Sequence, residues 1–107
     1  MKIPETLKGR VRRAEEIFRK EFIGAFMALN SATTAMFGKP FYHILIMNPE
    51  SVMKLLREYT MDDEVAITLL LKSMLKGLVE DPDALQDAVE ALRNDEYDKF
   101  KKLIGAD

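Results

Sequence analysis

Residues 62–79 are the most apolar stretch of the chain, and they constrain its fold more than any other segment. A narrow polar strip interrupts the apolar side chains, at Thr68, Lys72 and Lys76. On a helix the apolar positions cover roughly half of the circumference, with Val65 and Leu69 beside the polar strip. A single neighbouring helix cannot bury so wide a face. We therefore expect this helix to lie at the centre of a helical domain.

The size and composition of the chain set broad limits. With 107 residues, 48% apolar and 32% charged, it is expected to form one soluble domain over residues 1–107. The chain has no cysteine, which excludes disulfides, thiolate metal sites and cysteine nucleophiles. No apolar run approaches the roughly 20 residues of a membrane span, and the first residues lack the apolar segment of a secretory signal. We expect a cytoplasmic protein that does not enter a membrane.

The strongest helical periodicity lies in residues 7–37, where apolar side chains recur every three or four positions. These are Leu7, Val11, Ala14, Phe18, Phe22, Ala25, Leu29, Ala32 and Met36. The pattern predicts one helix of about thirty residues that ends at Gly38, with Pro40 just beyond. Further apolar side chains lie off this stripe in the second half, at Ile23, Phe26, Met27 and Phe37. We expect the long helix to cross the central one through Phe18, Phe22, Ala25 and Leu29.

The remaining elements are also expected to be helices. Residues 41–47 suit either a strand or a helix, but a lone strand would have no partner for its backbone, so we predict a helix. Asn48 before Pro49, and Asp81 before Pro82, are typical helix starts. Breaks at Asn94 and Asp95 precede a last helix that carries Tyr97, Phe100, Leu103 and Ile104 until Gly105. The predicted fold is all-α, with about five helices in one bundle.

Two more specific predictions concern the helix that starts at Asn48 and the start of the central helix that follows it. Its inward face is predicted to consist of Val52, Met53, Leu55, Leu56 and Tyr59. Thr60 followed by Asp63 resembles a capping box for the central helix.

Residues 37–75 read FGKPFYHILIMNPESVMKLLREYTMDDEVAITLLLKSML and join an Asn-Pro-Glu helix start to an acidic turn and an apolar helix. This run of about forty residues resembles a family of small archaeal helical domains called output domains, whose function is not established. The resemblance implies an all-helical accessory or signal-output module. It carries no chemical motif and implies no functional residues.

Few side chains suggest chemistry. His43 is the only histidine, and metal sites usually need several ligands, so we expect a packed or surface role. The carboxylates of residues 62–64 point about 100° apart on a helix and suit its positive N-terminus better than a cation site. Ser31, Thr33 and Thr34 form the one hydroxyl cluster of the long helix, without a second histidine for a general-base relay. We predict no catalytic, cofactor-binding or metal-binding residues.

A basic cluster in the first helix is the main argument for a nucleic-acid partner. It consists of Arg10, Arg12, Arg13, Arg19 and Lys20. Glu15, Glu16 and Glu21 lie among these cations, and the whole chain has a net charge of −2, whereas nucleic-acid-binding domains are usually basic. The C-terminal third is rich in carboxylates, so we expect the cluster to pair within the chain or between subunits.

The predicted helices present more apolar surface than they can bury against one another. The second half of the long helix and the wide face of the central helix exceed what so small a domain can cover, and exposed apolar patches often mark interfaces. The sequence therefore favours a non-catalytic interaction or regulatory module that forms a homodimer, with a different protein as another partner. Alternatives are a small apolar ligand held among the helices, or weak nucleic-acid binding through the basic first helix.

Overall fold

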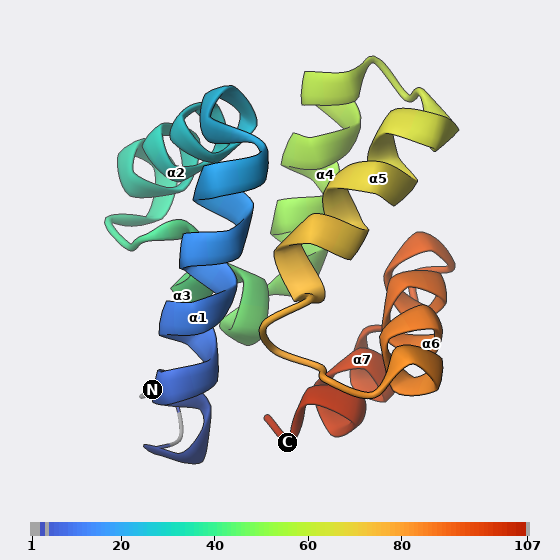
Figure 1. Ribbon diagram of the computed structural model, residues 1–107. Coiled ribbons are helices and arrows are strands. Elements are labelled where there is room, and N and C mark those ends of the chain that lie inside the picture. The colour runs from blue at the N-terminus through green and yellow to red at the C-terminus, as the bar shows by residue number, and fades with distance from the viewer. Residues whose placement is uncertain (1–2, 4, 107) are drawn as a thin grey trace.

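The computed structural model describes residue 3 and residues 5–106, and these contain seven α-helices (Figure 1). They are α1 (Glu5–Glu21), α2 (Ile23–Phe37), α3 (Phe41–Met47), α4 (Pro49–Thr60), α5 (Glu64–Leu75), α6 (Pro82–Arg93) and α7 (Tyr97–Ile104). No strand occurs in this part of the chain. The all-α class is confirmed, whereas the expected number of about five helices is too low.

The expected long helix is broken at Phe22, so the prediction of one helix over residues 7–37 was wrong. Phe22 has φ −140° and ψ 65°, outside the helical region, and α2 leaves the joint in a new direction (Figure 1). The break is compatible with continued hydrogen bonding, because the Phe22 N–H donates to the Phe18 carbonyl at 2.8 Å. Packing explains it: the Phe18 ring lies 5.9 Å from both Phe26 and Phe41, measured between centroids. A bent chain surrounds Phe18 with aromatic rings on more sides than a straight helix allows.

Local capping chemistry sets the starts and stops of several helices as the sequence predicts. The Asn48 side chain accepts from the Ser51 N–H at 3.4 Å and begins α4. The Asp81 carboxylate accepts from the Ala84 N–H at 2.8 Å and begins α6. Gly38 ends α2 with φ 68°, a left-handed conformation that glycine adopts without steric cost.

The start of α5 differs from the expected capping box. Asp63 is itself the N-cap, and its carboxylate accepts from the N–H groups of Val65 and Ala66 at 2.9 and 3.1 Å. Thr60 instead donates its hydroxyl to the Leu56 carbonyl at 2.9 Å, within the last turn of α4. The Thr60 prediction was therefore wrong, because a left-handed turn at residues 61–62 separates the two helices.

α5 contacts more than one helix, as its wide apolar face predicts. It packs on α1, α4 and α6, while α2 packs on α1, α3 and α4, and α7 packs on α6. It ends before residue 79, the expected limit, because the chain turns at Gly77 against the backbone of Ala14 in α1. Leu78 stays buried although it lies outside the helix.

Two long side chains connect helices that are distant in sequence. The Arg10 guanidinium donates to the carbonyl of Leu78 at 2.8 Å and to that of Ile104 at 3.1 Å. The buried Tyr42 hydroxyl lies 2.8 Å from the Met74 carbonyl and 3.2 Å from the Ala14 carbonyl. The Arg10 contacts place the first half of α1 beside the end of α7, as Figure 1 also shows.

Candidate functional site

Six large apolar side chains are exposed on or directly after the helices that form a groove between α2 and the α4–α5 pair, and two of the six, Tyr59 and Leu69, line the groove. The six are Ile23 and Met27 on α2, Tyr59 and Met61 at the end of α4, and Val65 and Leu69 on α5. Each is between 48% and 88% exposed. We call this surface the groove face.

The groove itself has a volume of about 430 Å³. Its walls come from α2, α4 and α5 and are mostly apolar: Phe22, Gly24, Ala25, Tyr59, Thr60, Ala66, Leu69 and Leu70. Beyond Phe22 and Leu69 it continues into a second hollow of about 400 Å³ that also contains Lys72 and Lys76. The break at Phe22 shapes this groove, because it turns α2 away from the line of α1.

A polar cluster closes the basic end of the groove. The Glu21 carboxylate accepts from the Ser73 hydroxyl at 2.7 Å and pairs with the Lys76 ammonium at 3.0 Å. These contacts lower the pKa of Glu21 below its ordinary value, with the Ser73 hydrogen bond as the largest cause and the Lys76 hydrogen bond next. The Ser73 side chain is buried and already hydrogen-bonded to Glu21. The cluster therefore connects α1 to α5 and does not have the arrangement of a nucleophile with its general base.

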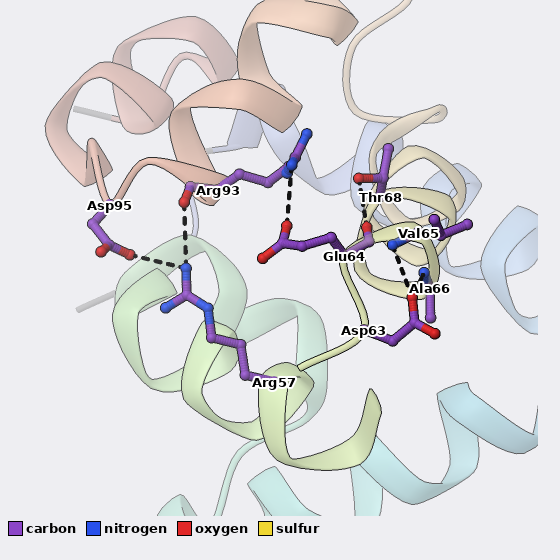
Figure 2. A network of polar contacts seen from close by, with 8 residues as sticks. All are labelled: Arg57, Asp63, Glu64, Val65, Ala66, Thr68, Arg93 and Asp95. Atoms are coloured by element: carbon purple, nitrogen blue, oxygen red, sulfur yellow. Dashed lines mark hydrogen bonds and ion pairs between the residues drawn. The ribbon is translucent and has the colours of Figure 1, made fainter. Parts of the chain in front are cut away.

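The opposite end of α5 is acidic, and Figure 2 shows how its carboxylates are used. Asp63 caps the helix, and Glu64 pairs with Arg93 at 3.0 Å. Arg57 donates to the Arg93 carbonyl at 3.3 Å and pairs with Asp95 at the same distance. The network ties α4, α5 and α6 together, so two of the three carboxylates of residues 62–64 serve the fold, as the sequence suggests.

The other candidate side chains lie apart from the groove face. His43 is partly buried in α3, where burial and then the nearby Lys39 lower its pKa. Thr33 and Thr34 donate to the Asn30 carbonyl at 3.1 and 2.8 Å, within α2. Within residue 3 and residues 5–106, no three His, Asp or Glu side chains converge as metal ligands.

The basic cluster is used mainly inside the molecule. Arg10 binds two backbone carbonyls, Arg13 pairs with Glu80 at 2.7 Å, and Arg19 pairs with Glu15 at 3.2 Å. The Arg19 guanidinium also lies 4.9 Å from the centre of the Phe26 ring.

Part of the groove face is predictable from the sequence, and the rest is not. Val65 and Leu69 stand beside the polar strip of the central helix, and both are exposed as that position suggests. Tyr59 was expected to face inward, but it is about half exposed and lines the groove. Phe26 was expected to contribute surplus surface, but it is buried against Phe18. Phe26 and its exposed neighbour Met27 point about 100° apart on α2, so one is buried while the other is exposed.

Comparison with known proteins adds no further constraint. No protein-family model, curated protein or solved structure matches the chain. None of the helices in the described part of the chain is long and apolar enough to cross a membrane.

Proposed function

We propose that this chain is a non-catalytic interaction or regulatory module that acts as a homodimer through the groove face. The observation that carries the proposal is that six large apolar side chains are exposed on or directly after the helices that form one apolar groove. Exposing such a group to water is unfavourable by about 25 cal/mol per Å² of apolar surface, and a partner that covers it recovers this free energy.

A second copy of the chain suits this face for two reasons. The face has both protruding side chains, such as Met61 and Val65, and a groove that can receive side chains, so it can be complementary to itself across a two-fold axis. It also joins an acidic end at residues 62–64 to a basic end at Lys72 and Lys76, so two reversed copies attract rather than repel each other.

Sedimentation velocity at micromolar concentration tests the proposal. We expect a species of twice the 12.3 kDa mass of the chain. Leu69→Glu should shift this species to the monomer with an unchanged helical circular dichroism spectrum, because Leu69 is exposed and its replacement leaves the core intact. The matched control is Met36→Glu, an exposed apolar residue at the far end of α2, which should leave the dimer unchanged.

A wild-type protein that sediments as a monomer throughout the micromolar range would contradict the proposal. So would equal dimerisation of wild type and Leu69→Glu. Phe26→Glu is not suitable for this test, since Phe26 is buried and the variant would unfold the domain.

The groove supports a second candidate function, the binding of a small apolar ligand. Its volume of about 430 Å³ and its apolar walls fall within the range of small-molecule sites. Native mass spectrometry of the purified protein tests this function. A bound mass lost in Gly24→Leu, which is designed to fill the groove from α2, would support it, whereas a spectrum of ligand-free chains would contradict it.

A further inference from the structure

The exposed strip of α5 has opposite charges at its two ends and apolar side chains between them. Val65 and Leu69 form the middle, and Lys72 follows on the same side of the helix, because residues four and seven positions apart share a face. The turn of residues 62–64 lies at the other end and is acidic.

Two members of this strip have no ion-pair role inside the described part of the molecule. Asp62 and Lys72 are both exposed, and neither belongs to an ion pair among residue 3 and residues 5–106. By contrast, Glu64 is engaged with Arg93, and Lys76 with Glu21. Asp62 and Lys72 are therefore the charges that are available to a partner.

Hollows flank the strip on both sides. One is the groove toward α2, and the other is a hollow of about 280 Å³ lined by Glu64, Val65, Thr68, Leu69 and Arg93. Leu69 lines both hollows and Val65 lines the second one, so Leu69 forms a ridge between the two depressions. Helices pair favourably when the ridge of one lies in a groove of the other.

We propose that two copies pair through α5 in antiparallel orientation about a two-fold axis near Ile67, with Asp62 of each copy opposite Lys72 of the other. This inference rests on the proposed homodimer and specifies its geometry. Ile67 lies midway between Val65 and Leu69, so the axis places Val65 of one copy against Leu69 of the other. Lys72 lies five positions after Ile67, about 7.5 Å along α5, and Asp62 lies in the turn just before the N-cap Asp63, on the other side of Ile67 along the chain, so the same axis brings Lys72 of each copy to the end of the partner helix that follows Asp62. The antiparallel orientation also opposes the two helix dipoles favourably.

Charge exchange between Asp62 and Lys72 tests this geometry. In Asp62→Lys, two lysines face each other at both contacts of the dimer, and in Lys72→Asp two aspartates do so. Each variant alone should dimerise roughly tenfold more weakly than wild type at low salt. An equimolar mixture of the two variants restores opposite charges at both contacts, so it should form a heterodimer with a dissociation constant within about twofold of the wild-type value.

Fluorescence anisotropy of labelled Asp62→Lys titrated with Lys72→Asp measures the dissociation constant of the heterodimer. Lys54→Asp, on the exposed side of α4, is the matched control for a charge change elsewhere. Residue 62 has φ 60°, so Asp62→Lys adds some backbone strain, but the mixing experiment compares association and not folding. Loss of association in both variants, with recovery in the mixture, supports the geometry. A wild-type dimer whose variants all associate equally overturns it while leaving the proposed homodimer intact, and a monomeric wild type overturns both.

Discussion

Gly77 lies directly against the backbone of Ala14, where α1 crosses the end of α5. A Cβ atom added at Gly77 would come within 2.4 Å of the Ala14 nitrogen and 2.5 Å of its Cα. Real Cβ atoms do not approach backbone so closely, and neither helix has a flexible side chain at this point that could move aside. The central helix therefore reaches its place only because residue 77 has no side chain.

Gly77→Ala should accordingly lower the free energy of unfolding by about 3 kcal/mol, since α1 must separate from α5 to admit one methyl group. Urea denaturation followed by circular dichroism measures the change. The control is Gly9→Ala in α1, where an added Cβ meets nothing within 4 Å. That variant should gain roughly 0.5–1 kcal/mol, because alanine favours a helix interior over glycine. Equal stability of the two variants would contradict the close approach.

Tyr42 supplies a hydrogen bond that α5 lacks at its end. Leu78 donates its N–H to the Leu75 carbonyl instead of continuing the helical pattern, so the Met74 carbonyl takes the Tyr42 hydroxyl as its donor at 2.8 Å. Tyr42→Phe should cost about 1–2 kcal/mol, the usual cost of leaving a buried polar group without its partner. Tyr59→Phe is the matched control, because Tyr59 is about half exposed, and it should change stability by less than about 0.5 kcal/mol.

The Tyr42 hydroxyl also affects how the free energy of unfolding changes at high pH. Burial, and secondarily the charge of Glu15, raise the pKa of Tyr42 far above its ordinary value of 10.0. The folded state therefore holds the proton that an unfolded chain releases. This contribution to stability is fully present below pH 10 and is lost as the pH rises further. Urea midpoints measured from pH 8 to pH 11 should fall more steeply for wild type than for Tyr42→Phe, and parallel curves would contradict this account.

The features that the sequence predicted correctly are those set by neighbouring residues. Asn48 and Asp81 cap their own helices, and Gly38 ends its helix by its own conformation, so their effects can be read within a few positions. The break at Phe22 depends instead on Phe41, a residue 19 positions later whose ring packs against Phe18. Periodicity continues unchanged through the break and gives no sign of it.

The candidate site was only partly predictable for the same reason. Val65 and Leu69 could be recognised as exposed from their position beside polar residues on one helix. The groove needs α2 to turn away at residue 22, and its walls combine residues of three helices, among them Tyr59 of α4. Such a surface is defined by contacts between elements, which no pattern within one element contains.

Arg10 is predicted to hold the two ends of the chain together. Its guanidinium satisfies the carbonyls of Leu78 and Ile104, which lie at the ends of separate segments and need donors. Arg10→Met keeps most of the side-chain volume and should cost about 2 kcal/mol, with faster amide hydrogen exchange in α7. Arg12→Met, on the exposed side of the same helix, should have little effect on either measurement. If α7 exchanges equally in both variants, Arg10 does not have this role.

The charges of α1 lead to a last prediction, which concerns nucleic acids. Affinity for phosphates requires several cations to act together on adjacent phosphates, and it falls as salt rises. Arg10 and Arg13 are engaged with C-terminal groups, and Arg19 with Glu15 and Phe26, so few cations of the cluster remain to act in this way. We therefore expect no sub-micromolar binding to duplex DNA or structured RNA at about 150 mM salt in a fluorescence titration.

Arg12→Glu combined with Arg19→Glu provides the matching variant for that titration. It should leave self-association unchanged and cost about 1 kcal/mol of stability, because it removes the exposed Arg19–Glu15 ion pair and the contact of Arg19 with the Phe26 ring. Tight binding by wild type that this double variant abolishes would make nucleic-acid recognition the better description of α1. Weak binding that disappears equally in both proteins as salt increases is the expected result, because unspecific attraction between a few exposed cations and phosphates is screened within about 8 Å at physiological ionic strength.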